Sequence, residues 1–218
     1  MWRENLKKLW YWLARWACRL FCILFFRFRV FGKENVPRKG PLLLVSNHQS
    51  YLDPVFCGVA LKRQLHYLAR ESLFVNPFFR ALICSVNAIP VRRGRADLSA
   101  MKTVIARLRQ GRAVCLFPEA TRTPDGRIAP FKGGVALLAK RGRATILPVV
   151  IDGAFECWPR HKKLFSPGAK VTVCYGEPIA AEQLDKMDDR QLARLLTDTL
   201  RRMQNDSRIK QGKDPYDY

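Results

Sequence analysis

The sequence predicts an α/β fold: a single domain with a central, mainly parallel sheet flanked by helices, plus an N-terminal amphipathic membrane-surface helix. The first observation behind this prediction is the alternation of short apolar segments with helical patterns, which is typical of parallel sheets covered on both faces. The second is the length of 218 residues, which gives room for one such domain and a short extra element. The third is the basic, tryptophan-rich start of the chain. We therefore divide the chain into a helical element (residues 1–33), the domain (34–205) and a polar tail (206–218).

The first helix is expected to lie in the interface plane of a membrane. From Leu9 to Phe26 the chain is apolar except for Arg15 and Arg19, and its longest uncharged run is far shorter than the roughly 20 residues that cross a bilayer. Basic residues and tryptophans suit the interface, because each keeps one end in water. The alternative is a helix packed on the domain with its basic face solvated. A signal peptide is not indicated, since the apolar core is interrupted and no small-residue cleavage site follows.

The alternating elements begin after a turn-rich stretch. Strands are expected at residues 42–46, 65–69, 88–91, 113–117, 145–151 and 170–175, the last as a candidate edge strand. Helices are expected at residues 53–61, 77–84, 98–108, 133–140 and 182–203. The end of the chain from Asn205 is polar and is expected to fray. In a sheet of this kind, sites form at the carboxyl ends of strands and in the loops that follow them.

The charge balance limits the partners. With 39 Lys and Arg against 18 Asp and Glu, the formal net charge is +21. Nucleic acid, an anionic membrane or a small anionic substrate such as a phosphate ester all fit this surplus. A non-enzymatic nucleic-acid-binding protein is the alternative from a different class, but the basic residues are spread out and no binding module is recognisable. We therefore expect no nucleic acid partner.

The cysteines and histidines do not indicate a metal site or a disulfide framework. Seven cysteines are scattered singly through apolar stretches, with no C-x-x-C pair, and the three histidines lie far apart. We expect reduced, mostly buried cysteines in a protein that faces the cytosol. His66 lies in a strand pattern and His161 in a basic loop, and both are interpreted as structural.

The segment N-H-Q-S-Y-L-D-P contains the leading catalytic candidates. His48 directly follows a buried strand, where a substrate can reach it. Asp53, five residues later, can turn back to the imidazole, fix its tautomer and stabilise the imidazolium form. The alternative for Asp53 is a helix N-cap, a common role for aspartate before a proline.

Three further segments contain candidate residues at or near strand ends. Arg92, Arg93 and Arg95 form either a phosphate clamp or a solvated basic loop. Glu119 and Arg122 follow the strand at 113–117 and, taken alone, are typical of a weak surface ion pair.

Lys132 lies further along the same segment as Glu119 and Arg122. It opens a helix, and helix N-termini suit anions. The last of these segments has Pro148 within the expected strand at 145–151. A proline at this position is adequately explained by an edge or bulged strand.

In their order and spacing, these segments resemble the four blocks of the glycerolipid acyltransferase family, whose best-known members are the 1-acylglycerol-3-phosphate (lysophosphatidic acid) acyltransferases. The resemblance covers about residues 40–179. The first block, N-H-x-x-x-x-D, is matched by Asn47, His48 and Asp53, and Pro148 matches the proline of the fourth. The resemblance implies His48 as the general base and Asp53 as its partner.

The second and third blocks imply an acceptor-binding site. The second ends in an arginine, matched by Arg93, and the third, usually F-P-E-G-T-R, reads F-P-E-A-T-R with Glu119 and Arg122. Two positions differ from the family pattern. Arg92 stands where an acidic residue is frequent, and Ala120 replaces a glycine, which makes a positive φ less favourable there.

The implied reaction is transfer of a fatty acyl group from a thioester to the free hydroxyl of 1-acylglycerol-3-phosphate, giving phosphatidic acid for phospholipid biosynthesis. The thioester, on coenzyme A or acyl carrier protein, is a co-substrate, and no cofactor or metal is expected. His48 removes the hydroxyl proton, while Arg93, Arg122 and Lys132 hold the acceptor phosphate. Cys57 and Cys115 are interpreted as core thiols.

Some alternatives remain open. The acceptor could be another lysophospholipid, glycerol phosphate or an amino-lipid. We expect the enzyme on the cytoplasmic face of the cell membrane, as a peripheral or monotopic protein bound to anionic phospholipid.

Overall fold

The structure is a computed structural model that describes residues 2–92, 97–131 and 133–218. The strands of these residues are β1 (Arg29–Phe31), β2 (Leu42–Ser46), β3 (Leu65–Arg70), β4 (Ala88–Val91), β5 (Ala113–Leu116), β6 (Thr145–Asp152) and β7 (Thr172–Tyr175). The α-helices are α1 (Trp2–Phe25), α2 (Asp53–Val59), α3 (Pro77–Ser85), α4 (Leu98–Arg109), α5 (Gly134–Gly142), α6 (Ala154–Cys157), α7 (Ala181–Leu184) and α8 (Asp189–Lys210). Two 3-10 turns, η1 (Lys33–Asn35) and η2 (Glu71–Phe74), complete the described elements.

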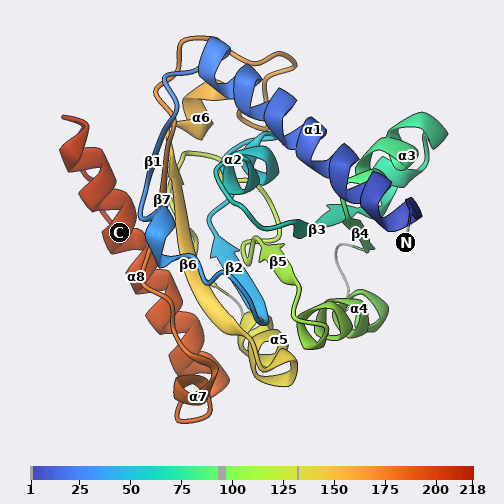
Figure 1. Cartoon of the computed structure of the whole chain (residues 1–218). Coiled ribbons are helices and arrows are strands. Elements are labelled where there is room, and N and C mark those ends of the chain that lie inside the picture. Colours follow the sequence, from blue (N-terminus) through green and yellow to red (C-terminus); the bar gives the residue numbers. More distant parts are fainter. Residues whose placement is uncertain (1, 93–96, 132) are drawn as a thin grey trace.

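The strands form one sheet in the order β1-β7-β6-β2-β5-β3-β4 (Figure 1). Neighbouring strands run parallel except β6 and β7, which are antiparallel. The predicted single domain with a mainly parallel sheet is confirmed. Because β2 lies between β5 and β6 at the centre, the loop that follows it opens among the ends of several strands.

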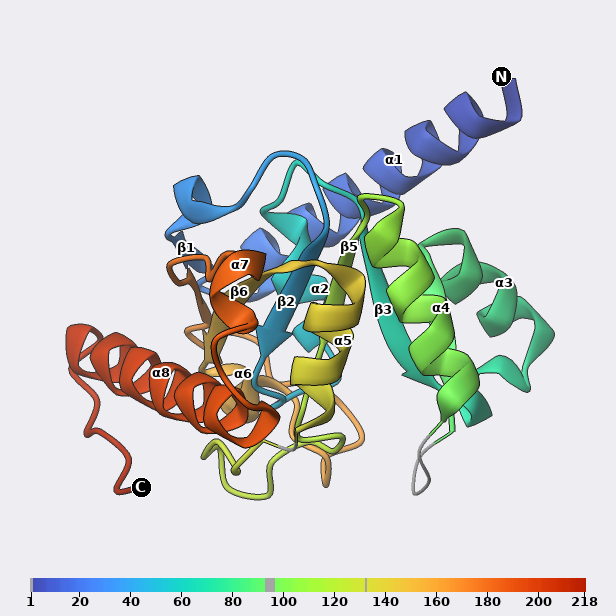
Figure 2. The same cartoon turned by 90° about the horizontal axis from the view of Figure 1, so that it is seen from below.

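Two hydrophobic cores lie on the two faces of the sheet (Figures 1 and 2). Successive side chains of a strand point to opposite faces, so Leu42 and Leu44 enter one core and Leu43 and Val45 the other. The first core packs against α1, α2 and α6, and the second against α4, α5 and α8. All residues of β2 are buried, as expected for a central strand covered on both faces.

Two strand predictions need correction. β7 is not an edge strand, because the short strand β1 pairs with its outer side. β1 has only three residues, R-V-F, too few to show a periodicity. β6 is also internal, although Pro148 lies within it. The Pro148 carbonyl accepts a hydrogen bond from Gly176 N, just beyond the last residue of β7, so the proline lies where the pairing of β6 with β7 ends.

The helix expected at residues 182–203 is two helices. α7 ends at Leu184, and Asp188 begins α8 by accepting hydrogen bonds from Arg190 N and Gln191 N in a capping box. α8 then continues to Lys210, so the expected fraying from Asn205 is wrong.

α1 packs along the domain on one side only. Tyr11, Cys22 and Phe26 are buried, and Arg15 turns inward to donate to the carbonyls of Val59 and Leu61 at 3.0 and 3.1 Å. The guanidinium therefore satisfies the last carbonyl of α2 and one in the turn that follows it, and is not part of a solvated basic face. The opposite side of α1 remains apolar and exposed. None of the helices in the described ranges combines the length and apolar character needed to cross a membrane.

Candidate active site

The candidate site lies where β2 and β5 end. The strands are parallel neighbours, so the residues that follow them meet at the same edge of the sheet. His48 follows β2, and the β5 loop (residues 117–131) carries Glu119 and Arg122. Thr123 N donates to His48 O at 2.8 Å, which joins the two loops directly.

His48 and Asp53 make the contact that the sequence predicted. Nδ1 of His48 lies 2.7 Å from Oδ2 of Asp53, and the same oxygen accepts hydrogen bonds from Gln49 N at 2.6 Å and Ser50 N at 2.7 Å. Asp53 is fully buried and His48 is 8% exposed. Asp53 is the first residue of α2, but its carboxylate turns back toward His48, so the N-cap interpretation is wrong. Because Nδ1 contacts the carboxylate, Nε2 is the ring nitrogen that is available to a substrate.

Neighbouring side chains fix the position of His48. The ring of Phe117 stacks on the imidazole with centroids 4.4 Å apart and planes 22° apart. Asn47 precedes His48. Its side-chain amide donates to Ile151 O in β6 at 2.9 Å and accepts from Ile151 N at 2.8 Å. The loop is thereby bound to the sheet on one side and to an aromatic ring on the other, which holds the imidazole in one orientation.

Glu119 binds backbone amides from two segments. One carboxylate oxygen accepts from His48 N at 2.8 Å and the other from Ala129 N at 3.3 Å. Burial raises the pKa of Glu119 to about 7, against the opposing effect of these two N–H donors. The surface ion pair with Arg122 is therefore wrong: within the described residues Glu119 joins the β5 loop to the His48 loop.

Arg122 lies over an aromatic ring beside His48. Its guanidinium carbon is 3.4 Å from the centroid of Tyr51, a residue of the His48 loop. Stacking leaves the donors at the edge of the guanidinium plane free for other partners. One of them, Nη1, is buried and has no hydrogen-bond partner among the described residues. A buried unsatisfied donor is costly, so this geometry suits a bound anion.

Ala120 adopts the left-handed conformation with a φ of 57°. The turn therefore keeps this backbone conformation without the glycine, although alanine makes a positive φ less favourable.

The remaining predicted residues fall outside this cluster. Arg93 and Lys132 lie outside the described residues. Arg92 pairs with Glu71 of η2 at 3.2 Å, with both side chains mostly exposed. Pro148 pairs with Val45 inside the sheet and so lies below the level of His48.

The other two histidines take no part in the described contacts of the site. His66 lies in β3 opposite Val114, and burial lowers its pKa to about 4. His161 is exposed.

Comparison with known proteins agrees with this geometry. The family model described as Acyltransferase matches residues 27–152. The chain belongs to the acyltransferase family. The resemblance drawn from the four sequence blocks, and the enzyme class that it implied, are confirmed.

Individual relatives extend the match beyond this region. The acyltransferase is 30% identical over 173 residues to 1-acyl-sn-glycerol-3-phosphate acyltransferase of Bacillus subtilis, covering 79% of this chain and 83% of that protein. It is 27% identical to a chloroplastic 1-acyl-sn-glycerol-3-phosphate acyltransferase of Brassica napus, covering 76% of this chain but only 48% of the relative. The crystal structure of PlsC, the 1-acyl-sn-glycerophosphate acyltransferase of Thermotoga maritima, superposes with a TM-score of 0.82 at 27% identity, covering 94% of this chain and 82% of that one.

Some residues of the acyltransferase site were not predicted from the sequence. Gln49 is buried and donates to Gly126 O at 2.8 Å, while its side-chain oxygen accepts from Phe155 N at 3.3 Å. Its place between His48 and Asp53 could have indicated a role. Tyr51, Phe117 and the residues of α8 that reach the β5 loop give no such signal, because only the fold brings them together.

Proposed function

We propose that this acyltransferase moves a fatty acyl group from a thioester to the free hydroxyl of 1-acylglycerol-3-phosphate, with His48 as the general base. The observation that carries the proposal is the 2.7 Å contact between His48 Nδ1 and Asp53 Oδ2 at the end of β2, with the buried donor of Arg122 beside it. The acceptor is supported by the relatives, which are named for this substrate.

Acid–base chemistry follows from the position of the imidazole. With its Nδ1 proton donated to Asp53, His48 offers a lone pair at Nε2 to the acceptor hydroxyl. The hydroxyl oxygen attacks the thioester carbonyl as its proton passes to Nε2. The tetrahedral intermediate then breaks the carbon–sulfur bond, and the imidazolium returns the proton to the leaving sulfur. General-base help of this kind contributes typically about 10²–10⁴-fold.

Arg122 supplies the contact to the acceptor phosphate in this proposal. Its ring-stacked guanidinium has a fixed plane, and its buried Nη1 lacks a partner among the described residues. Arg93 and Lys132 are further phosphate ligands that the sequence suggests. The thioester carrier is coenzyme A or acyl carrier protein, and competition between the two donors in one assay distinguishes them.

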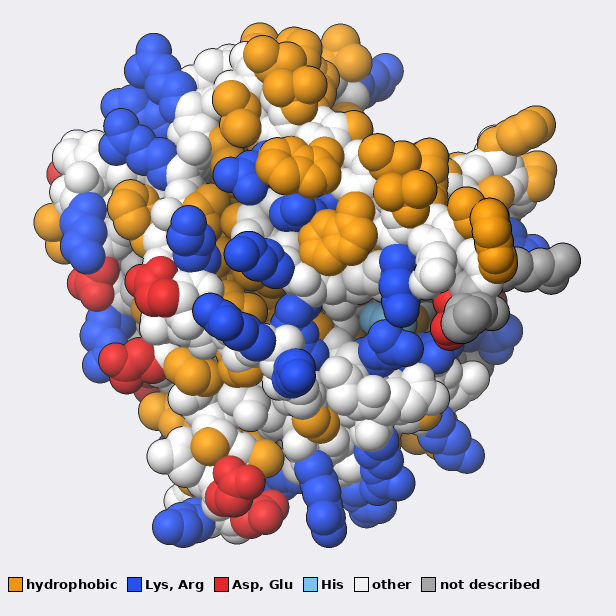
Figure 3. Space-filling view, in the orientation of Figure 1, with side chains coloured by type: hydrophobic (Ala, Val, Ile, Leu, Met, Phe, Trp, Pro, Cys, Tyr) orange, Lys and Arg blue, Asp and Glu red, His pale blue; other side chains and the backbone are white. Residues whose placement is uncertain are grey.

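We also propose that the acyltransferase works on a phospholipid surface. The outward side of α1 exposes leucines such as Leu6 and Leu24, at 57% and 70%, and α3 with the turn before it exposes Val75 and Phe78, at 82% and 86%. In Figure 3 hydrophobic side chains gather along the side where α1 and α3 lie, with Lys and Arg close by. Large exposed apolar surfaces mark interaction sites, and basic residues favour anionic lipid by about 1 kcal/mol each. The cytoplasmic face of the cell membrane is the surface that we expect.

The test of the catalytic proposal is a pair of histidine variants. His48→Ala should lose transfer from the thioester to lysophosphatidic acid by at least a hundredfold, with an unchanged melting temperature. His161→Ala is the matched control, because this histidine is exposed and lies outside the cluster. Transfer at the wild-type rate by folded His48→Ala protein would refute the general-base role.

A further inference from the structure

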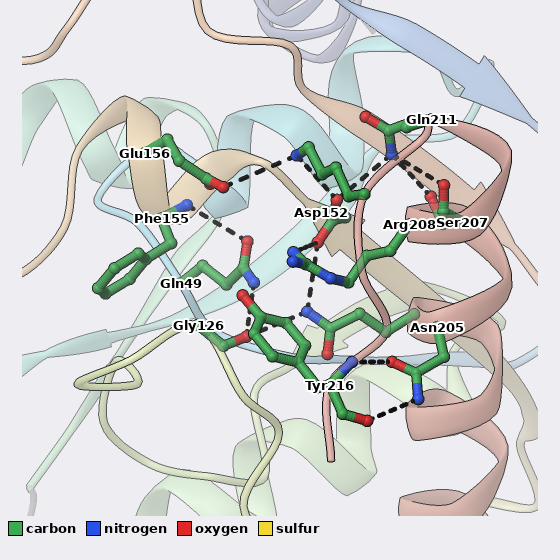
Figure 4. A network of polar contacts seen from close by, with 12 residues as sticks. Gln49, Gly126, Asp152, Phe155, Glu156, Asn205, Ser207, Arg208, Gln211 and Tyr216 are labelled. Atoms are coloured by element: carbon green, nitrogen blue, oxygen red, sulfur yellow. Dashed lines mark hydrogen bonds and ion pairs between the residues drawn. The ribbon is translucent and has the colours of Figure 1, made fainter. Parts of the chain in front are cut away.

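The chain after α8 turns back along this helix, so that Tyr216 lies beside Asn205 (Figure 4). Asp152, at the end of β6, holds the start of this segment. Its buried carboxylate accepts hydrogen bonds from Arg208 at 3.4 Å, Gln211 at 3.3 Å and Lys213 at 3.2 Å. A buried carboxylate needs such partners, and here they come from α8 and the tail segment (residues 211–218) together.

A second set of contacts fixes the direction of the tail segment. The backbone of Tyr216 exchanges two hydrogen bonds with the Asn205 side chain, at 2.8 and 3.0 Å. The guanidinium of Arg208 lies over the Tyr216 ring, 3.9 Å from its centroid, and its Nε donates to Asp214 O at 2.7 Å. The tail segment is therefore bound along α8 before it reaches its last residue.

Tyr218 then reaches the β5 loop. Its hydroxyl accepts a 3.2 Å hydrogen bond from Ile128 N and donates to the side-chain oxygen of Gln204. The other end of the Gln204 amide donates to Gly126 O at 3.0 Å. Arg201 lies over the Tyr218 ring and donates twice to Ile128 O, at 3.1 and 2.9 Å. Both backbone groups of Ile128 are thus held by the tail segment and α8.

The same stretch of loop contacts the catalytic segment. Gly126 O, which Gln204 binds, also accepts from Gln49, the residue after His48. Ala129, the residue after Ile128, donates its N–H to Glu119, which in turn accepts from His48 N. The two hydrogen bonds of the Tyr218 hydroxyl are therefore one residue or one shared acceptor away from a contact of the active site.

We propose that the tail segment is a positioning element that holds the β5 loop, and with it Arg122, in place for the acceptor. This inference rests on the proposed function. Residues 117–131 contain no helix or strand, so their position depends on such contacts. Neither hydrophobic core includes a described residue beyond Met203, so the tail segment acts through polar and aromatic contacts, and those of Tyr218 bear on the loop.

The test uses variants of Tyr218 in the full chain. Tyr218→Phe removes only the hydroxyl that joins Ile128 and Gln204, and Tyr218→Ala also removes the ring over Arg201. Asp217→Asn is the matched control, because its side chain is exposed in the same segment. Four quantities are measured: the KM for lysophosphatidic acid, the KM for the thioester, kcat, and the hydrogen exchange of the amides of the β5 loop.

The expected result is a change confined to the loop and the acceptor. Tyr218→Ala should raise the acceptor KM about tenfold or more, and Tyr218→Phe by less, while the thioester KM stays constant. Both should speed exchange of the Ile128 and Ala129 amides, and Asp217→Asn should do neither. Constant acceptor KM and loop exchange in the Tyr218 variants would overturn the proposal. A lower melting temperature together with similar changes in kcat and in both KM values would also overturn it, because a merely structural role gives that result.

The design separates this inference from the proposed function. If the wild-type protein does not acylate lysophosphatidic acid, the proposed function fails, and loop exchange alone decides whether the tail segment positions the loop. If the wild type is active and the Tyr218 variants match Asp217→Asn in both readouts, only the positioning role fails.

Discussion

Glu119 accepts a 2.8 Å hydrogen bond from the backbone amide of His48, so the loops after two neighbouring strands share one partly buried carboxyl group. Both of its oxygens face N–H groups, yet burial raises its pKa to about 7 from an ordinary value of 4.5. The proton of Glu119 is therefore linked to the stability of the site, and the direction of that linkage follows from the shift.

This linkage predicts how the Glu119→Gln substitution changes the pH dependence of stability. Below pH 4.5 both the folded and the unfolded protein keep the proton on Glu119; between 4.5 and about 7 only the folded protein does. The unfolded state is then favoured as pH rises, so the contribution of Glu119 to the free energy of unfolding falls by on the order of 3 kcal/mol and is constant above about pH 7. Urea unfolding of wild type and Glu119→Gln at pH 5 and 7.5 measures this. Equal pH dependence in both proteins would contradict the shift.

Ala120→Gly should stabilise the acyltransferase. The left-handed φ of 57° costs an alanine roughly 1–2 kcal/mol, and glycine avoids this cost at a smaller entropic loss. A net gain of about 0.5–1 kcal/mol in the free energy of unfolding is expected. Ala180→Gly is the control, because its φ of −65° gives glycine no advantage. Destabilisation by Ala120→Gly comparable to that of the control would rule out strain at this turn.

Asp53→Asn should lower kcat by about a hundredfold or more and leave the acceptor KM nearly constant. The amide oxygen can still accept from Gln49 N and Ser50 N, so the loop keeps its shape. A neutral side chain, however, does not stabilise the imidazolium that forms on His48. The steady-state kcat and KM of Asp53→Asn are compared with those of Asp198→Asn, which changes an exposed carboxylate on α8. A rise in acceptor KM without loss of kcat would assign Asp53 to binding instead.

Arg122→Ala should remove the preference for a phosphorylated acceptor. Wild type is expected to acylate lysophosphatidic acid at least tenfold more efficiently than the monoacylglycerol that lacks the phosphate. Arg122→Lys should recover little of this, because an ammonium group does not reproduce a planar guanidinium stacked on Tyr51. Arg127→Ala, on an exposed residue of the same loop, is the control. Unchanged discrimination between the two acceptors in Arg122→Ala would place the phosphate elsewhere.

The sequence predicted well those features that depend on nearby residues. The His48–Asp53 contact spans five positions, and the central strands β2 and β5 are short, mainly apolar runs. It predicted poorly those that depend on distant partners. Glu119 and Arg122 were placed at a strand end, but a bond to a backbone amide 71 positions away, or a stacked Tyr51, has no local signature.

The tail segment was also predicted poorly, because it was expected to be less ordered than it is. Its polar composition indicated fraying, because composition records the absence of an apolar face and not the presence of specific hydrogen bonds. Tyr218 binds Ile128, 90 positions earlier, and Asp152 binds Lys213, 61 positions later. Neither partner can be inferred without the sheet that brings β6, the β5 loop and α8 together.

The proposed membrane surface on α1 leads to a prediction about lipid binding. Leu13 and Leu20 are each 56% exposed, and moving a leucine side chain into an apolar phase is worth about 1.5–3 kcal/mol. The double variant Leu13→Asp, Leu20→Asp should therefore bind anionic phosphatidylglycerol vesicles at least a hundredfold less tightly. Ile209→Asp is the control: it is 58% exposed on α8, which packs on the other face of the sheet from α1. Co-sedimentation with vesicles measures the binding, and raised salt should weaken the wild type as its basic residues are screened. Equal sedimentation of the double variant and the control would show that α1 does not contact lipid.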